Sequence, residues 1–336
     1  MNYIGIDIGG TKCAVSLGTP EGLEARTLMD RVEFPTAQTR GPEATIRQFC
    51  AIISALLQHH ALQPGDIGAI GISCGGPLDS KTGMILSPPN LIGWDNIPVV
   101  QMLRDAFGIK TYLQNDANAC ALAEWKYGAG AGTRDMVFLT FGTGLGAGII
   151  ADGRLVEGAS GMAGEVGHVR LAPHGPVGYG KEGSFEGFCS GGGIAQIART
   201  KVLEQLQSGQ KPSFCSSVPE LDTLNAKKVA EAAAQGDPVA LAIYDCCGEK
   251  LGYGLSMLID ILNPEAIVIG SVFARAESLL RKKMQAVIVR EALSYSAECC
   301  KILPAKLGDR LGDFAAISVA VYGLEREERA EYGNHQ

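Results

Sequence analysis

The chain has 336 residues, of which 46% are hydrophobic and 19% charged, and its formal net charge is −7. This length exceeds what one small core needs, so we expect two domains. The acidic balance without a basic cluster argues against a nucleic-acid partner. No apolar run approaches the roughly 18 residues of a membrane span, and the opening MNYIGIDIGG lacks the regions of a signal peptide. We therefore expect a cytoplasmic protein without a membrane partner.

Cysteine and glycine usage narrows the class of protein. The ten cysteines include two adjacent pairs, Cys246-Cys247 and Cys299-Cys300, and form no CxxC motif. This pattern fits buried thiols in a reducing compartment better than disulfides or a zinc ribbon. The 44 glycines exceed the usual share of about 7%. They cluster at the ends of apolar runs, where the backbone turns tightly or approaches a ligand.

The first half of the chain alternates strands and helices. Strands expected over residues 3–8 and 13–17 flank a Gly-rich turn, a hairpin whose turn is large enough for a phosphate. Residues 42–58 keep apolar side chains at helical spacing. Strands over 67–73 and 111–113 and a helix over about 117–126 follow. This order predicts an α/β fold with helices on both faces of a sheet.

The second half repeats the opening pattern. A strand over 136–141, a Gly/Thr turn and a strand over 147–151 form another hairpin, which suggests a duplicated domain. A helix begins after Asp237, which is its expected N-cap, and ends before Asn263-Pro264. A buried strand is expected over 266–269. Asp313 is the expected cap of a last long helix over about 314–325, and the charged tail beyond it is expected to fray.

The two Gly/Thr turns, one in each half, suit a nucleotide held between domains, because glycine lets backbone amides approach phosphate oxygens. Each turn alone is equally compatible with an ordinary tight turn. Neither is a Walker A loop, and neither is a GxGxxG fingerprint that opens a helix. Asp7 precedes the first turn, where a carboxylate suits Mg²⁺ beside phosphates. The alternative role for Asp7 is to cap the turn.

Asn115 and Asp116 stand where an expected strand ends and a helix begins. Either residue suits an N-cap. A helix N-terminus also keeps a carboxylate ionised, and a hydroxyl that attacks phosphorus needs an acceptor for its proton. The two phosphate-type turns in the same chain favour Asp116 as this base.

Six motifs follow one another in a recognisable order. They are DIGGTK (7–12), GISCGGPLD (71–79), PNLIGWD (89–95), QNDANACALAE (114–124), TFGTGLGAGI (140–149) and GEVGH (164–168). Together they resemble the ROK (repressor, open reading frame, kinase) family of sugar kinases over essentially the whole chain. The resemblance implies the actin-like/hexokinase-like ATPase fold, two related α/β domains with the active site in the cleft between them. We expect one domain over 1–116, completed by the C-terminal helix at about 312–336, and the other over 117–311.

The resemblance also implies roles for individual residues. Asp116 matches the catalytic base that takes the proton of the sugar hydroxyl. The expected sugar contacts are Gly76, Asn90, Asn115, Asp116, Glu165, His168 and Glu186. The first phosphate loop comprises Asp7, Gly9, Gly10, Thr11 and Lys12, and the second comprises Thr140, Gly142, Thr143 and Gly144. The residues expected to close around adenosine are Gly191, Gly192, Gly270 and Ser271, of which Ser271 departs from the usual glycine.

The structural zinc motif of the family, CxCGxxGCxE, is broken in this chain. Val177, Tyr179 and Ser184 occupy its cysteine positions, and only His168 remains. Valine cannot bind zinc, and tyrosine and neutral serine are poor ligands beside thiolate. We expect no structural zinc, and we expect packing by Tyr179 and Phe185 to replace it. The alternative is a rebuilt site of His168, His174 and Cys189.

The resemblance implies ATP-dependent phosphorylation of a hexose with Mg²⁺ as the cofactor. Glucose is the first expectation, with N-acetylmannosamine, mannose, fructose and allose as alternatives, and polyphosphate remains open as the donor. A homodimer is expected by family analogy, with helices over 229–262 and 314–325 as candidate interfaces.

Three other functions are alternatives to a sugar kinase. Family repressors carry a helix-turn-helix domain before the kinase-like part. This chain opens almost directly on the first phosphate strand, so we do not expect a repressor. A non-catalytic sugar sensor would be expected to have lost Asp116 or a phosphate turn, and this chain retains both. An acetate-type kinase is disfavoured because Glu165 and Glu186 would repel an anionic acceptor.

Overall fold

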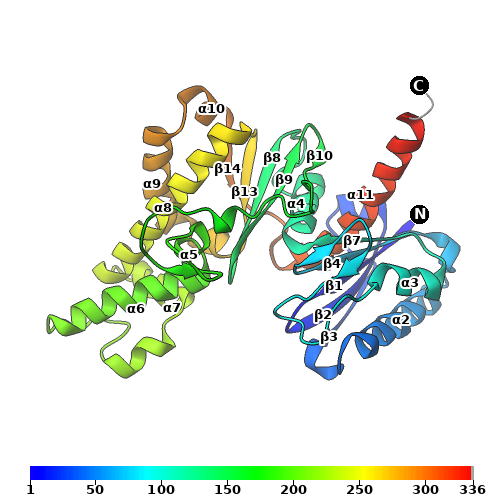
Figure 1. Ribbon diagram of the computed structural model, residues 1–336, viewed down its shortest axis with the longest axis horizontal. Coiled ribbons are helices and arrows are strands. Elements are labelled where there is room, and N and C mark those ends of the chain that lie inside the picture. The colour runs from blue at the N-terminus through cyan, green and yellow to red at the C-terminus, as the bar shows by residue number, and fades with distance from the viewer. Residues whose placement is uncertain (334–336) are drawn as a thin grey trace. The chain divides into compact units, whose positions relative to one another are not determined.

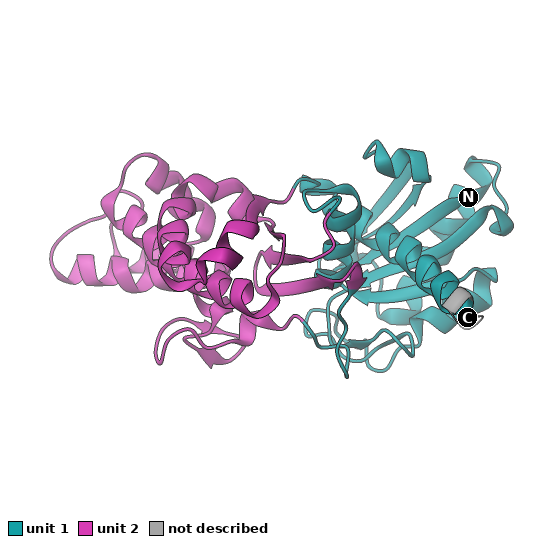
Figure 2. Cartoon of the chain, turned by 90° about the horizontal axis from the view of Figure 1, so that it is seen from above, with its two compact units in different colours: residues 1–132, 155–163, 306–336 teal, residues 133–154, 164–305 magenta. Residues whose placement is uncertain are grey.

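The computed structural model describes residues 1–333 (Figure 1). It divides into two compact units, drawn in different colours in Figure 2. Unit 1 comprises residues 1–132, 155–163 and the chain from 306 onward, and unit 2 comprises residues 133–154 and 164–305.

These bounds differ from the expected ones in two main places, and the C-terminal segment of unit 1 begins at residue 306 and not at about 312. Helix α4 (Asp116–Tyr127) belongs to unit 1 because it packs against the C-terminal helix α11 (Leu311–Gly333). The short segment 155–163 returns to unit 1 in the middle of the second half. Both departures depend on contacts between distant parts of the chain.

Unit 1 is built on a five-stranded mixed sheet in the order β3-β2-β1-β4-β7. Strands β1, β2 and β3 are antiparallel neighbours, whereas β4 and β7 run parallel to β1. The strands are β1 (Asn2–Ile8), β2 (Lys12–Gly18), β3 (Asp30–Pro35), β4 (Ile67–Cys74) and β7 (Thr111–Asn115).

Unit 2 repeats this plan in the order β10-β9-β8-β13-β14. Strands β8 and β9 form an antiparallel hairpin, and β13 and β14 continue the sheet in parallel with β8. The repeated hairpin predicted from the sequence is therefore confirmed. The strands are β8 (Met136–Phe141), β9 (Leu145–Ala151), β10 (Arg154–Leu155), β13 (Ala266–Ile269) and β14 (Lys301–Pro304).

Helices complete each unit, and two-residue strands form small hairpins in the loops. In unit 1 the other helices are α1 (Pro20–Glu24), α2 (Pro42–His59) and α3 (Val99–Phe107), with β5 (Leu78–Asp79) and β6 (Met84–Ile85). In unit 2 they are α5 (Phe185–Phe188), α6 (Gly191–Gln207), α7 (Ala226–Ala234), α8 (Pro238–Leu262), α9 (Val272–Glu291) and α10 (Ser294–Cys299), with β11 (Val177–Gly178) and β12 (Lys181–Glu182). Among the helices of the described chain, none combines the length and apolarity needed to cross a membrane.

Each unit has its own hydrophobic core. In unit 1, Ile6 and Ile72 of the sheet and Phe49 of α2 are fully buried. In unit 2, α8 packs closely on α9 because Gly248 and Gly252, one turn apart, leave room for the backbone of α9 at Leu280 and Met284. The sequence places apolar residues on both sides of these layers, so each unit forms a complete core of its own.

Two expected helix bounds are wrong for local reasons. The stretch 229–262 is two helices, because Gly236 has a φ of +86° and ends α7. Asp237 then caps α8 by accepting the backbone N–H groups of Val239 and Ala240. Asp313 is not a cap, because α11 already begins two residues earlier.

The tail of the chain is helical through the last described residue, although it was expected to fray after Glu325. Glu325 accepts from Lys126 of α4 at 2.7 Å, and Glu327 accepts from Lys110 at 2.8 Å. Arg326 pairs with Glu157 at 2.6 Å. The charges that suggested a solvated tail bind α4, the loop before β7 and the segment 155–163.

Candidate active site

The proposed sugar- and phosphate-binding residues of unit 1 lie at the carboxyl ends of its parallel strands. Strands β1, β4 and β7 are parallel neighbours, and Ile8, Cys74 and Asn115 align across them. The loops that follow these strands therefore leave the sheet side by side. Ligands of α/β proteins bind at such carboxyl ends of parallel strands.

The turn after β1 is compact and contacts the loop of Asn90. Gly9 donates its N–H to the carbonyl of Lys12 at 3.1 Å. A Cβ on Gly10 would lie 2.9 Å from the Asn90 backbone oxygen, so only glycine allows the two loops to touch. Thr11 is exposed. The Lys12 ammonium is paired with Glu33 at 2.8 Å.

The structure separates the roles of Asn115 and Asp116. The Asn115 side chain caps α4 by accepting the N–H of Ala117 at 3.0 Å, which leaves Asp116 in the first turn of the helix. Asp116 is exposed and also accepts the N–H of Ala117, at 2.8 Å. A Cβ on Gly76 would lie 3.3 Å from the Asn115 amide nitrogen, so Gly76 lies beside these residues. A helix N-terminus favours the ionised carboxylate of Asp116.

Asp7 lies in an acidic environment. Burial, together with the negative charges of Asp313 and Asp116, raises the pKa of its carboxyl from the ordinary value of 3.8 to about 6. The helix α11 approaches this carboxylate through Gly312, whose missing side chain leaves space for it. A divalent cation would offset the repulsion between these carboxylates, so the oxygen donors present fit Mg²⁺.

Asp313 lies within electrostatic reach of Asp7, a position that the sequence did not reveal. It is 4% exposed and accepts from Ser16 at 3.0 Å and from the Arg31 guanidinium at 2.7 Å. Its position directly before an apolar helix suggested an N-cap, and no local signal indicated a partner on β3.

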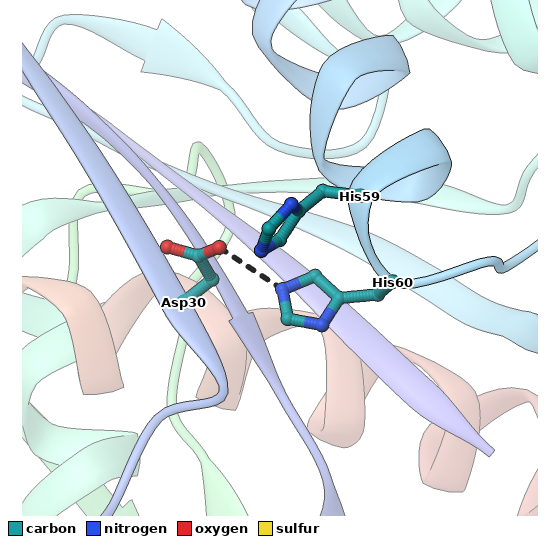
Figure 3. Close-up of side chains that lie close together, drawn as sticks. All are labelled: Asp30, His59 and His60. Atoms are coloured by element: carbon teal, nitrogen blue, oxygen red, sulfur yellow. Dashed lines mark hydrogen bonds and ion pairs between the residues drawn. The ribbon is translucent and has the colours of Figure 1, made fainter.

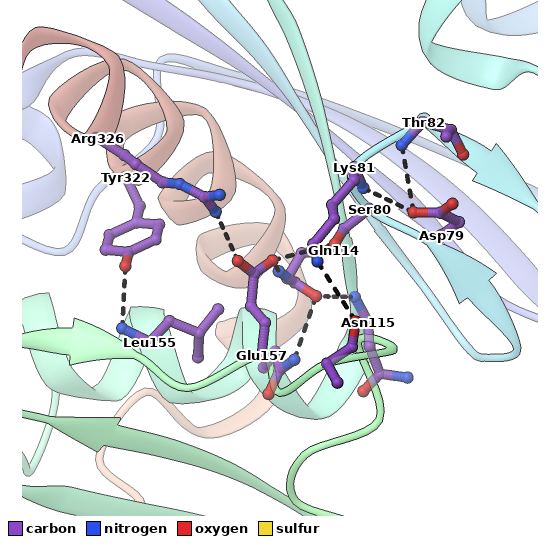
Figure 4. Close-up of polar contacts among 12 residues, drawn as sticks. Asp79, Ser80, Lys81, Thr82, Gln114, Asn115, Leu155, Glu157, Tyr322 and Arg326 are labelled. Carbon is purple, nitrogen blue, oxygen red and sulfur yellow. Dashed lines mark hydrogen bonds and ion pairs between the residues drawn. The ribbon is translucent and has the colours of Figure 1, made fainter. Parts of the chain in front are cut away.

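A buried amide positions the strand end that carries Asn115 (Figure 4). Gln114 is 7% exposed, and its Oε1 accepts the Asn115 N–H at 2.9 Å and the Asn118 amide at 3.2 Å. Its Nε2 donates to Glu157 at 3.1 Å. Glu157 also accepts from Ser80 at 3.0 Å. Together with the Arg326 pair, this network ties the end of β7 to α11 and to the segment 155–163.

In unit 2, the turn between β8 and β9 is closed by its own hydrogen bonds. Gly142 donates its N–H to the carbonyl of Gly144 at 3.0 Å. The Thr140 hydroxyl accepts from the N–H of Gly146 at 2.9 Å and donates to its carbonyl at 3.3 Å. Thr140 thus stabilises the hairpin, whereas Thr143 is exposed at the tip.

The start of α6 lies against this turn. Ser190 caps the helix by accepting the N–H of Gly193, and Gly191 donates to the carbonyl of Gly142 at 2.8 Å. A Cβ on Gly192 would lie 3.5 Å from the Thr143 carbonyl oxygen. A helix N-terminus next to a Gly/Thr turn is a favourable place for phosphate oxygens.

The strand–helix junction at Gly270 and Ser271 also lies near the turn. Ser271 precedes α9 with a φ of +52° and a ψ of −108°, a backbone conformation that strongly favours glycine. Its hydroxyl lies 3.9 Å from where a Cβ on Gly142 would stand. Serine at this position combines backbone strain with a hydroxyl directed at the turn.

The residues of unit 2 that were predicted to bind the sugar lie against the β8–β9 hairpin. Glu186 accepts the N–H of Leu145 at 2.9 Å and packs beside Gly167, which lies between Glu165 and His168. The GEVGH segment is tied to β9 because Ala147 donates to the carbonyl of Gly164 at 2.9 Å. Glu165, His168 and Glu186 therefore belong to one local assembly with the second turn.

The loop that lacks the zinc cysteines is held by backbone bonds and packing. Val177 and Gly178 pair with β12, and Ser184 is fully buried and caps α5 by accepting from Gly187 at 3.1 Å. Phe185 is 1% exposed and packs inside the loop as expected. The expected packing by Tyr179 is wrong, because this side chain is 78% exposed and meets the His168 ring edge to face with centroids 6.2 Å apart.

The alternative ligand set does not gather. Cys189 is fully buried and donates to the Cys247 carbonyl at 3.6 Å, and His174 lies at the surface beside Glu182. Within residues 1–333, the ligand atoms of His168, His174 and Cys189 do not approach one another as a metal site requires.

Comparison with known proteins supports these motifs. The family model described as the ROK family matches residues 3–321. A glucokinase of Halalkalibacterium halodurans is 33% identical over 334 residues, which are 99% of this chain and 98% of that protein.

Two solved structures share the fold. A ROK family glucokinase from Streptomyces griseus, in complex with glucose and AMPPNP, has a TM-score of 0.72 at 28% identity, covering 96% of this chain and 99% of that one. A ROK family transcriptional regulator, a homologue of the E. coli MLC protein, has a TM-score of 0.80 at 25% identity, covering 96% of this chain and 78% of that one. Because the family model spans nearly the whole sequence and a relative aligns from end to end, the chain belongs to the ROK family.

Proposed function

We propose that the protein is an ATP-dependent sugar kinase with a hexose, first of all glucose, as its acceptor. The observation that carries the proposal is the placement of Asp116 at the start of α4, beside Asn115 and Gly76 and within electrostatic reach of Asp7. The full-length similarity to a glucokinase supports the same reaction.

In the proposed reaction, Asp116 accepts the proton of one sugar hydroxyl as that oxygen attacks the γ-phosphorus of ATP. The bond between this phosphorus and the bridging oxygen of ADP breaks as the new P–O bond forms. Bound Mg²⁺ would neutralise phosphate charge, and Asp7 is its proposed protein partner, directly or through water. Domain closure would exclude water, so that the phosphoryl group reaches the sugar.

The two units contribute different groups to this proposal. The sugar would be held by Gly76, Asn90, Asn115, Glu165, His168 and Glu186. The phosphates would lie on the two turns and at the N-terminus of α6, and adenosine would lie near Gly191, Gly192, Gly270 and Ser271. Carboxylates and an imidazole suit the vicinal hydroxyls of a sugar.

The similarity to a transcriptional regulator makes a sugar-responsive, non-catalytic protein the second candidate. The intact base, acidic site and phosphate turns favour the kinase, because sugar sensing alone requires no proton acceptor aimed at an attacking hydroxyl.

The function is tested by measuring ADP release from Mg·ATP, and from Mg²⁺ with polyphosphate, over a panel of glucose, mannose, fructose, allose and N-acetylmannosamine. We expect sugar-dependent turnover with a clear preference for glucose. Sugar binding without turnover on any acceptor would contradict the kinase and support the sensor.

Asp116→Asn tests the base. The substitution preserves shape and removes the proton acceptor, so kcat should fall by about 10²–10⁴-fold while sugar affinity changes little. Asp105→Asn on α3, an exposed aspartate that accepts a hydrogen bond from Gln101 of its own helix, is the matched control. Near-normal turnover of the Asp116 variant would remove it as the base.

Asp7 predicts a pH dependence of stability. Because its folded pKa is raised to about 6, the folded chain binds this proton more tightly than the unfolded chain, and the group lowers stability as the pH rises from about 4 to 6. Without metal or nucleotide, Asp7→Asn should therefore melt a few degrees above wild type at about pH 8 and level with it at about pH 4. A variant less stable than wild type at about pH 8 would contradict this prediction.

We also propose a homodimer formed through unit 2. Exposed apolar side chains gather on α8, α9 and the start of α10, namely Met257, Ile261, Val289, Leu293 and Tyr295. Light scattering should give the mass of two chains for wild type and for the control Val218→Glu, which changes an exposed valine elsewhere in unit 2, and of one chain for Ile261→Glu. A monomeric wild type would exclude this interface.

A further inference from the structure

Three potential metal ligands converge in unit 1 away from the candidate active site (Figure 3). Ligand atoms of Asp30, His59 and His60 all lie within 4.8 Å of one another. Asp30 is the first residue of β3, His59 is the last residue of α2, and His60 is the C-cap of that helix. Strand and helix thus bring together residues 30 positions apart.

The adjacent histidines face one another because the chain leaves the helix between them. His60 has a φ of −93° and a ψ of 7°, outside the helical conformation. The two rings meet edge to face, with centroids 4.9 Å apart and an interplanar angle of 86°. A ring nitrogen of His59 turns toward the space occupied by the Asp30–His60 contact (Figure 3).

The carboxylate is oriented before any ion binds. Asp30 Oδ1 accepts the N–H of Arg31 at 2.7 Å, which leaves Oδ2 facing His60 Nε2 at 2.9 Å. The side chains of His60 and Asp30 are 20% and 31% exposed, so they are partly shielded and still reachable. The hydrogen bond from His60 lowers the pKa of Asp30, which favours its anionic form.

The donor set selects a class of metal. Two imidazoles and one carboxylate are the ligands of Zn²⁺ and of similar divalent ions such as Co²⁺ and Ni²⁺, whereas Mg²⁺ and Ca²⁺ prefer oxygen alone. With both imidazoles neutral, the site carries one negative charge, which attracts a dication. Three protein ligands leave a fourth position for water.

We propose that Asp30, His59 and His60 form a binding site for one zinc-type divalent ion. The ion would displace the Asp30–His60 hydrogen bond and use its two atoms together with a nitrogen of His59. It would join the end of α2 to β3, the outermost strand of its sheet. The three ligands belong to unit 1, whereas the loop without the zinc cysteines belongs to unit 2.

The test titrates Co²⁺ into the full-length protein after treatment with a chelator, with visible absorption as the readout, followed by displacement with Zn²⁺. We expect saturation near one ion per chain, with no sulfur-to-metal charge-transfer band. His59→Ala and Asp30→Asn should each weaken this binding by at least about ten-fold. His174→Ala is the matched control, because His174 also pairs with a carboxylate, Glu182 at 3.4 Å, but within residues 1–333 no third potential ligand joins them.

Thermal melting gives a second readout that does not depend on colour. Added Zn²⁺ should raise the melting temperature of wild type and of His174→Ala, and not of His59→Ala, because binding to the folded state alone stabilises it. Equal Co²⁺ affinity in wild type and His59→Ala would overturn the proposal. A thiolate charge-transfer band at the first equivalent would also overturn it, since it would place the ion on cysteine.

Discussion

The close contact of α11 with the sheet of unit 1 is the constraint on which the rest of that unit depends. Gly5 of β1 and Gly71 of β4 present bare backbone to the helix at Ala316 and Ile317, and a Cβ at either glycine would collide with it. The helix therefore lies close to the strands. Glycine in these strands costs conformational entropy and is used where such an approach requires it.

The contact positions charge along the whole helix. At its first turn α11 brings Gly312 to the Asp7 carboxylate and Asp313 to Arg31. Further along, Tyr322 accepts the N–H of Leu155 at 2.9 Å, and Arg326 binds Glu157. Glu157 in turn holds Gln114, which holds the backbone of Asn115. The proposed base thus depends on a helix nearly two hundred positions later in the sequence.

Local patterns predicted the fold well, because the residues that determine each strand and turn are neighbours in the sequence. The strand at 136–141 and the strand at 266–269 agree with the structure residue for residue, as does the capped start of the helix after Asp237. The six motifs also led to the family. The wrong predictions concern contacts with distant residues. The chain after Glu325 is helical and forms ion pairs with Lys126 and Lys110, and no local sequence pattern indicates these partners.

For the candidate site, the sequence predicted which residues are present but not their hydrogen-bond and ion-pair partners. It could not show that Thr140 stabilises its own hairpin, that Lys12 is paired with Glu33, or that Asn115 and not Asp116 caps α4.

The chain connects the two units more than once. The chain passes between them after residues 132, 154, 163 and 305, so neither unit is a continuous segment. A single proteolytic cut at any of these crossings would leave the units covalently joined, and no truncation at one point yields either unit alone.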